Sequence, residues 1–167
     1  ADLHTMDDVN RYPWPDPAEV DYSHLVEDCE RVRDFAVVLG GAGIPDIVNG
    51  VSRGRGMEQV LMDIALRDEV GMAIIDRRVD YWYVVMRRAL EVARGHVDIL
   101  HLGEDCGTQN GRLFSAPDFD EVFRPRLKKF YDLAHEFGCK AMMHSCGDTH
   151  DLQSTFIDMG LDVLDAM

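Results

Sequence analysis

Short apolar runs alternate along this chain with longer segments in which apolar residues recur every three or four positions. The apolar runs span residues 35–39, 97–102, 140–144 and 162–167. The longer, amphipathic segments span residues 23–33, 56–66, 69–94, 117–137 and 151–159. Strands that are apolar on both faces and are separated by helices are typical of parallel βαβ units. The pattern therefore predicts an α/β fold with a parallel sheet, either doubly wound or part of a (β/α)8 barrel.

Residues 1–22 do not share this alternation. They include Tyr12-Pro13-Trp14-Pro15-Asp16-Pro17, where three prolines within five positions oppose a helix and favour an extended chain. We expect an extended, proline-rich connector over residues 1–22, attached to the body of the domain through Trp14.

A glycine-rich string, Gly40-Gly41-Ala42-Gly43, follows the first apolar run and predicts a tight turn between a strand and a helix. It does not meet the dinucleotide-binding fingerprint, because Asp46 stands where the last glycine belongs and Pro45 interrupts the helix start. Two guanidinium groups, Arg53 and Arg55, are expected near the start of the next helix. They either hold a substrate carboxylate or are simply solvated.

The charge balance makes nucleic-acid and anionic-membrane partners unfavourable. The 31 acidic and 17 basic residues give a net charge of −14, and the basic residues form scattered pairs rather than a patch. An uninterrupted run of about 18 apolar residues, which a membrane-spanning helix needs, does not occur. Four sparse cysteines without a signal peptide favour a reducing compartment, and we expect a cytoplasmic protein.

The string His144-Ser145-Cys146-Gly147 stands at the end of the third apolar run. Alternate residues of an extended segment point the same way, so the His144 imidazole and the Cys146 thiol leave the strand on one face. Imidazole nitrogen and thiolate sulfur are ligands that suit Zn²⁺. The spacing alone favours the other interpretation, a structural hydrogen bond at His144 and an ordinary buried thiol at Cys146.

A second polar string, Glu104-Asp105-Cys106, occupies the corresponding end of the preceding strand. Neighbouring parallel strands lie about 4.8 Å apart, so these side chains are within reach of His144. A carboxylate here would orient a substrate or a metal-bound imidazole, and Cys106 is a possible third ligand. The alternative is a solvated acidic loop in which Asp105 caps a turn.

Five strings of the chain resemble a known family when they are taken together and in order. They are residues 11–16 (RYPWPD), 55–58 (RGME), 101–111 (HLGEDCGTQNG), 123–128 (FRPRLK) and 144–147 (HSCG). The strings are similar to those of the uroporphyrinogen decarboxylase superfamily, and more narrowly to its corrinoid-linked, methylcobalamin-dependent methyltransferases. The resemblance implies a TIM barrel of roughly twice this length or more, with residues 1–167 as a single-domain piece holding about four βα units from its middle.

The resemblance also implies a zinc enzyme. In the methyltransferase branch a His-x-Cys pair and a later cysteine hold the metal; His144 and Cys146 match the pair, and the third ligand is expected beyond Met167. Glu104 and Asp105 would be catalytic, orienting the substrate or the imidazole. The cobalamin would arrive on a separate corrinoid protein, with a small-molecule methyl donor or a thiol acceptor as the other substrate.

Two further functions remain open at this point. One is decarboxylation of uroporphyrinogen-like substrates in porphyrin biosynthesis, although the decarboxylases lack the His-x-Cys pair and have a shorter loop where this chain has residues 103–111. The other is a catalytically incomplete half-barrel. Four parallel strands cannot close a barrel, so we expect self-association or contact with the remainder of a barrel.

Overall fold

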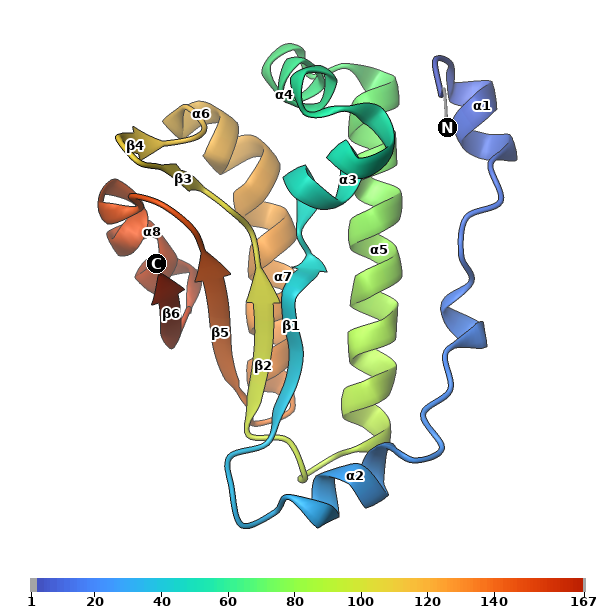
Figure 1. Cartoon of the computed structure of the whole chain (residues 1–167), viewed down its shortest axis with the longest axis vertical. Helices are drawn as coiled ribbons and strands as arrows, with labels where there is room; N and C mark the ends of the chain where they lie inside the picture. The colour runs from blue at the N-terminus through green and yellow to red at the C-terminus, as the bar shows by residue number, and fades with distance from the viewer. Residues whose placement is uncertain (1–2, 167) are drawn as a thin grey trace.

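The computed structural model describes residues 3–166, and its centre is a parallel four-stranded sheet (Figure 1). The strands are β1 (Val38–Pro45), β2 (Ile99–Gly103), β5 (Lys140–Ser145) and β6 (Val163–Ala166). Their order in the sheet, β1-β2-β5-β6, follows their order in the chain. The predicted α/β class with a parallel sheet is confirmed; Met167, the last residue of the fourth predicted run, lies outside the described residues.

The ladder register aligns side chains into rows across the sheet. One row contains Gly40, His101, Met142 and Val163, and a second row, two positions further towards the carboxyl ends and on the same face, contains Gly103, His144 and Asp165. Because paired residues of adjacent strands point to the same face, each row belongs to one face of the sheet.

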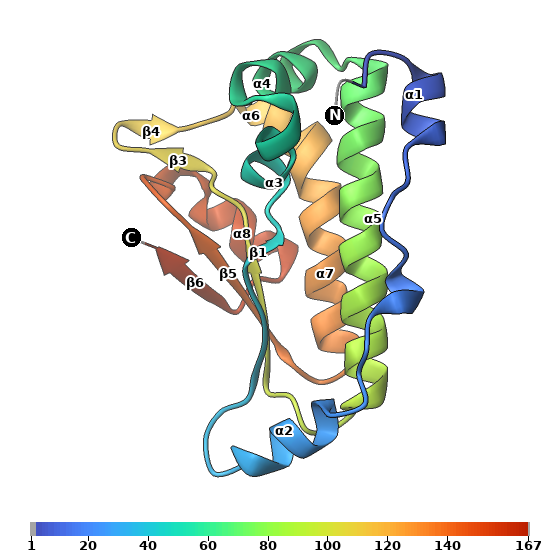
Figure 2. The same cartoon turned by 45° about the vertical axis from the view of Figure 1, so that its right-hand side comes forward.

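One face of the sheet is covered by helices and forms the core. The helices α5 (Glu69–Val92) and α7 (Arg124–Glu136) lie against it, and α8 (Gln153–Met159) extends this layer beside α7 (Figures 1 and 2). The strand side chains that point into this layer are fully buried: Leu100, Leu102, Ala141 and Met143. These strand side chains are buried because they pack against the apolar stripes of the helices, which the spacing of apolar residues predicted.

The opposite face, which we call the open face, carries no helix within residues 3–166. Its side chains are half-buried or exposed rather than buried: Val38, Ile99, His101, Met142, His144 and Val163. The open face thus carries apolar side chains together with two histidines, and only the face towards the helices is packed.

The remaining elements connect or flank these layers. They are α1 (Met6–Arg11), η1 (Pro17–Glu19), α2 (Leu25–Arg31), α3 (Ile47–Arg55), α4 (Met57–Leu66), β3 (Gly107–Thr108), β4 (Gly111–Arg112), α6 (Ala116–Asp118), η2 (Phe119–Phe123) and η3 (His150–Leu152). The predicted helix over residues 117–137 is thus divided, with a π-helical turn at η2 ahead of Pro125, which has no amide hydrogen to donate. No helix of the described residues is both long enough and apolar enough to cross a membrane.

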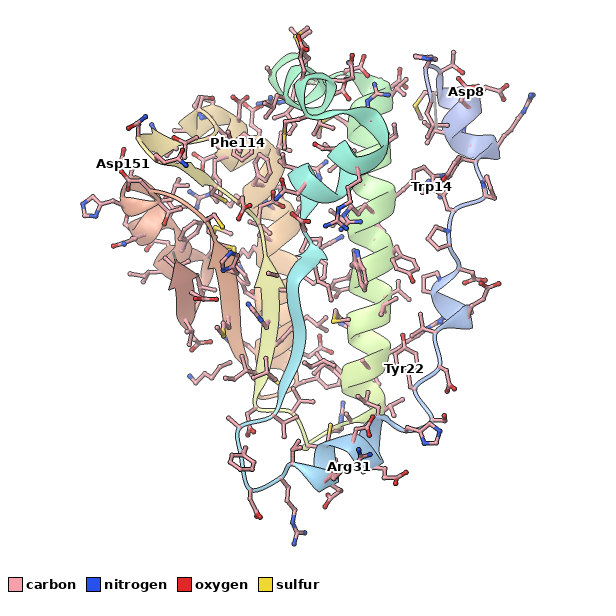
Figure 3. The ribbon with its side chains drawn as sticks, viewed as in Figure 1. Asp8, Trp14, Tyr22, Arg31, Phe114 and Asp151 are labelled. Carbon is pink, nitrogen blue, oxygen red and sulfur yellow. The ribbon has the colours of Figure 1, made fainter. Side chains whose placement is uncertain are left out.

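The prediction of an extended connector over residues 1–22 is wrong in part, because α1 and η1 interrupt the extended chain. Residues 1 and 2 lie outside the described residues. Thr5 and Asp8 form a reciprocal capping box that starts α1. This helix-start signal was overlooked because the prediction for the segment was based on the prolines that follow it. Beyond α1 the segment runs along α5, and Trp14 and Tyr22 point towards that helix (Figure 3). Tyr22 donates a hydrogen bond to the Val85 carbonyl at 3.2 Å, and Trp14 packs against the core as predicted.

The prediction for the first strand was wrong in its boundaries. The run 35–39 was expected to be a strand and Gly40–Gly43 a turn, but β1 begins at Val38 and continues through the glycines to Pro45. A Cβ at Gly40 would lie 2.2 Å from the His101 carbonyl oxygen, and one at Gly103 would lie 1.9 Å from the Ala42 carbonyl oxygen. The glycines therefore serve the close, irregular pairing of β1 with β2 rather than a turn.

Arg53 and Arg55 lie near the start of α4 at Met57, as predicted, and themselves form the last turn of α3. Arg55 forms a buried ion pair with Asp63 and donates to the Leu3 carbonyl at 2.7 Å. Arg53 is exposed, with Asp46 3.9 Å away. Arg55 is therefore occupied in holding the amino-terminal segment to α3 and α4.

Candidate metal centre

The site forms where β2 and β5 end side by side. The pairing of Gly103 with His144 places the residues that follow each strand opposite one another. Asp105 is the second residue after β2, and Cys146 comes directly after β5. His144, Cys146 and Asp105, three residues singled out from the sequence, are thereby brought together at the carboxyl ends of adjacent parallel strands.

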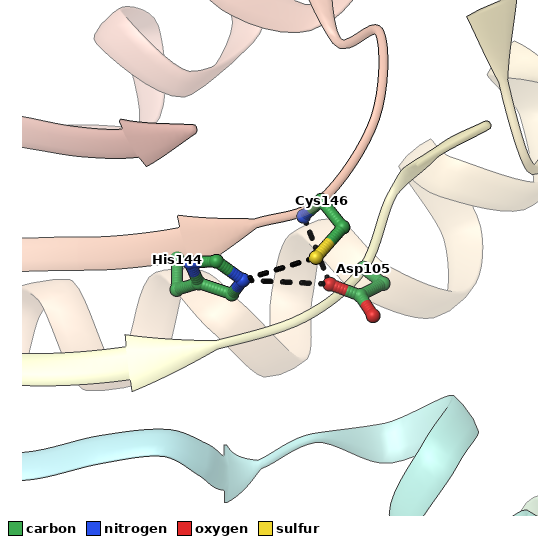
Figure 4. A group of neighbouring side chains, drawn as sticks. All are labelled: Asp105, His144 and Cys146. Carbon is green, nitrogen blue, oxygen red and sulfur yellow. Dashed lines mark hydrogen bonds and ion pairs between the residues drawn. The ribbon is translucent and has the colours of Figure 1, made fainter. Parts of the chain in front are cut away.

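The three side chains converge on one point (Figure 4). One ligand atom from each of Asp105, His144 and Cys146 lies within 4.8 Å of the others. His144 Nε2 is 3.2 Å from Cys146 Sγ and 4.0 Å from Asp105 Oδ1. A tetrahedral zinc ion with bonds of about 2.0 to 2.3 Å needs ligand atoms about 3.3 to 3.8 Å apart, so small side-chain adjustments fit the group to the ion.

Asp105 is held in place by two hydrogen bonds. Its Oδ1 accepts from the Cys146 amide at 2.9 Å, and its Oδ2 accepts from Asn49 Nδ2 at 2.9 Å. Burial alone raises the pKa of Asp105, but these hydrogen bonds and the nearby His144 together lower the pKa below its ordinary value. The carboxylate is thus ionised and still has lone pairs available, as a metal ligand requires.

The pKa of the Cys146 thiol is shifted in the opposite direction, upwards. Burial raises the pKa of its thiol, and the negative charges of Asp105 and Asp165 raise it further. In this arrangement the sulfur is protonated at neutral pH when no cation is bound. A divalent cation between the three side chains reverses that preference, because a coordinated thiol loses its proton.

His144 uses both of its ring nitrogens within the site. Nδ1 lies 3.2 Å from Asp165 Oδ2, while Nε2 faces Cys146 and Asp105. Asp165 was not singled out from the sequence, and neither was Asn49. The sequence signal for Asp165 was its place at the end of the fourth apolar run, where it pairs in register with His144.

Glu104 points away from this cluster. Its side chain is fully buried, and its carboxyl oxygens accept from the amides of Ile47 at 2.6 Å and Val48 at 3.2 Å, the first residues of α3. Burial raises the pKa of Glu104 to about 8, against the lowering effect of those two amides. Its carboxyl group therefore ties the loop after β2 to the amino end of α3; a catalytic role for Glu104 stays a prediction.

The other cysteines do not join the cluster. Cys106 is fully buried, and its thiol donates to the Glu104 carbonyl at 3.4 Å. Cys139 lies before β5, at the far end from the site, and its thiol donates to the Val97 carbonyl at 3.2 Å. Of Glu104, Asp105 and Cys106, only Asp105 brings its side chain into the cluster with His144.

His101, whose orientation the sequence left undecided, lies on the open face. Leu100 and Leu102 on either side of it point into the helix layer. Its Nε2 is buried and has no hydrogen-bond partner among the described residues, and burial lowers the pKa of the ring. His101 is therefore neutral at physiological pH.

The donor set fits a catalytic zinc site. One imidazole, one thiolate and one carboxylate are borderline-soft ligands of the types that bind zinc, and three protein ligands leave a fourth position for water or a substrate. No family model matches the sequence, and no curated protein matches it either. The function is therefore inferred from the geometry of this site and from the resemblance of its motifs.

Proposed function

We propose that this chain belongs to a zinc-dependent methyltransferase of the uroporphyrinogen decarboxylase-like superfamily, which transfers a methyl group to or from a corrinoid cofactor. The observation that carries the proposal is the convergence of Asp105, His144 and Cys146 at the carboxyl ends of β2 and β5. His144 and Cys146 are the pair that the resemblance identifies as zinc ligands.

The sheet supports a place for this site within a barrel. Its strand order follows the chain order, and the helices α5, α7 and α8 lie on one face, whereas a doubly wound sheet reverses its order and carries helices on both faces. In TIM barrels the active site lies at the carboxyl ends of the strands, which is where the cluster lies here. We take β1, β2, β5 and β6 as four strands of a (β/α)8 barrel.

Each residue of the cluster has a distinct task in this proposal. His144 Nε2 and Cys146 Sγ bind the zinc ion, and Asp105 supplies an oxygen ligand in the place of the third ligand that the resemblance puts beyond Met167. Zinc bound here would act as a Lewis acid that favours the thiolate form of a thiol substrate or polarises a methyl–oxygen bond. Cys146 must lose its proton when the metal binds, so metal uptake releases a proton.

The charges around the site favour methyl transfer over decarboxylation of a polycarboxylate. Asp105 belongs to the cluster and Asp165 contacts His144, and the negative charges of both act on Cys146. A substrate with many carboxylates would be repelled here unless cations offset them. An uncharged methyl donor or a metal-bound thiolate avoids this cost.

A metal and turnover assay tests the proposal. The chain is stripped of metal with a chelator, loaded with zinc and analysed for bound metal, and methyl transfer from methylcobalamin to a small alkyl thiol is followed by the change in the corrinoid absorbance. We expect about one zinc per chain, lost in Cys146→Ser and kept in the control Cys139→Ser.

The outcomes separate the alternatives. Equal zinc content in Cys146→Ser and Cys139→Ser would overturn the ligand assignment. Zinc binding without methyl transfer would favour the incomplete half-barrel. Decarboxylation of a uroporphyrinogen-like substrate by the metal-stripped chain would favour the decarboxylase.

A further inference from the structure

The contact between His144 and Asp165 joins two neighbouring strands next to the candidate metal centre. His144 of β5 pairs in register with Asp165 of β6, and both side chains lie on the open face. Nδ1 of His144 is 3.2 Å from Asp165 Oδ2, on the side of the ring opposite Cys146. The imidazole is therefore contacted at both nitrogens by groups of different chemistry.

The chemistry of these partners determines where the ring carries its proton. A neutral imidazole has one N–H, and an ionised carboxylate only accepts hydrogen bonds. Nδ1 must therefore donate to Asp165, which leaves the Nε2 lone pair directed towards Asp105 and Cys146. A metal ion can bind only to a ring nitrogen that carries no proton.

We propose that Asp165 is the positioning residue of this site: it holds His144 in the Nδ1–H tautomer and so presents Nε2 as the ligand atom. The value of this positioning to the protein rests on the proposed zinc site. Without Asp165 the ring is able to rotate about its side-chain bonds and to place its proton on Nε2, where it blocks coordination. A carboxylate that accepts a hydrogen bond from the other ring nitrogen of a metal-binding histidine typically contributes about 10- to 100-fold to metal affinity.

The other contacts of Asp165 support a dedicated role. Within residues 3–166 its carboxylate has no hydrogen bond or ion pair other than the one with His144. Asp162, three residues earlier, is different, because it binds Lys140 Nζ at 2.8 Å, His135 Nε2 at 2.8 Å and the Ala141 amide at 2.9 Å. Asp162 thus links structural elements, whereas the one hydrogen bond of Asp165 within the described part of the chain is with the candidate ligand His144.

Two measurements test the role of Asp165. The first is the nitrogen NMR spectrum of the His144 ring in the metal-stripped chain, which distinguishes the two tautomers directly. We expect the Nδ1–H tautomer in the wild type and in Asp165→Asn, whose amide oxygen still accepts the hydrogen bond, and a mixture of tautomers in Asp165→Ala. The second is zinc affinity, measured by competition with a chromophoric chelator.

For zinc we expect a loss of about 10- to 100-fold in Asp165→Ala and a much smaller loss in Asp165→Asn. The control is Asp158→Ala, which removes an exposed carboxylate from α8 and should change neither measurement. Thermal unfolding of each metal-stripped variant shows whether the fold is kept. If Asp165→Ala does not fold, the positioning role is tested by the tautomer of His144 in the wild type and in Asp165→Asn, and a wild type without the Nδ1–H tautomer would overturn it.

The two proposals fail in different ways. If the wild type binds no zinc, the proposed function fails, while the tautomer spectrum still decides whether Asp165 fixes the ring. If zinc binds but Asp165→Ala keeps both the wild-type tautomer and the wild-type affinity, the positioning role is overturned and the zinc site stands.

Discussion

Gly107 and Gly147 lie in backbone contact, so that the short hairpin after β2 rests directly on the loop that carries Cys146. A Cβ built on Gly147 would lie 2.5 Å from the Gly107 carbonyl carbon, and one on Gly107 would lie 2.7 Å from the Gly147 carbonyl carbon. The Asp148 amide donates to the Thr108 carbonyl at 2.7 Å and fastens the same contact. The geometry of the cluster thus depends on two residues without side chains.

Gly147→Ala should disturb both stability and metal binding. Gly147 also has a φ of +79°, which a residue with a Cβ rarely adopts. We expect a loss of about 2 kcal/mol or more in the free energy of unfolding and weaker zinc binding, because Cys146 must move with the loop. Chemical denaturation and a metal titration measure the two effects.

Gly54→Ala is the matched control for that substitution. Gly54 lies in α3, and a Cβ there meets nothing within 4 Å. Alanine favours a helix by up to about 1 kcal/mol over glycine, so this variant should be as stable as the wild type or more so, with unchanged zinc affinity. Equal behaviour of the two variants would contradict the importance of the Gly107–Gly147 contact.

Asp105→Asn should weaken zinc binding at least about 10-fold, because a neutral amide oxygen is a poorer ligand than a carboxylate. From the sequence, Asp105 was expected to orient the substrate or the imidazole; its position 4.0 Å from His144 Nε2 places it as a ligand instead. His144→Ala and Cys146→Ala should lose zinc altogether. The control is Asp151→Asn, at an exposed residue of η3, and a loss of zinc from it equal to that of Asp105→Asn would count against a ligand role.

Glu104 should make stability depend on pH. Its pKa is about 8 in the folded chain, above the ordinary value of 4.5, so the folded state holds a proton that the unfolded state releases. The stabilisation is complete below about pH 4.5 and is lost as the pH rises towards 8, by up to about 1.4 kcal/mol per pH unit. Urea denaturation across this range should show that decline in the wild type and a flatter profile in Glu104→Gln.

Glu136→Gln is the control for Glu104. The Glu136 carboxylate pairs with Arg87 on the surface, and this hydrogen bond lowers its pKa, so it does not titrate between pH 5 and 8. Its profile should parallel the wild type. A Glu104→Gln profile that also parallels the wild type would mean that Glu104 is ionised in the folded chain.

Part of this structure could be predicted from the sequence because it depends on local periodicity. Apolar stripes specified α4, α5 and α8, and alternation along residues 140–146 placed His144 and Cys146 on one face. The glycines of β1 could not be assigned correctly in this way. Their purpose is contact with the backbone of β2, a partner about 60 residues away, and nothing nearby in the sequence distinguishes that use from a turn.

The roles of the carboxylates were likewise set by distant partners. Glu104 and Asp105 are neighbours of the same chemical class, yet one binds the amides of α3 and the other faces the His-x-Cys pair. Asp165 gained its place only through the register of β5 with β6. Spacing along the chain identified the end of the sheet where the site lies, but the division of tasks there required the pairing of strands.

The open face of the sheet should govern the assembly of this chain. Val38 is 48% exposed and Val163 is 40% exposed, and half-buried Ile99 and Met142 lie between them in the sheet. Exposed apolar side chains of this kind favour burial against another surface over contact with water. We therefore expect the isolated chain to associate through the open face rather than persist as a monomer of 18.9 kDa.

Light scattering on the purified chain measures this association, and two matched variants locate it. Val163→Lys places a charge on the open face without touching the helix layer, and it should shift the chain towards the monomer. Ile157→Lys alters a side chain of α8 that is 71% exposed, away from the open face, and it should leave the assembly unchanged. A wild-type monomer that unfolds cooperatively would contradict the association, and a loss of assembly in Ile157→Lys alone would place the interface on the helix layer instead. The open face is the side on which β1, β2, β5 and β6 would face the interior of a barrel, so in a complete barrel the remaining strands would cover this face and remove the association.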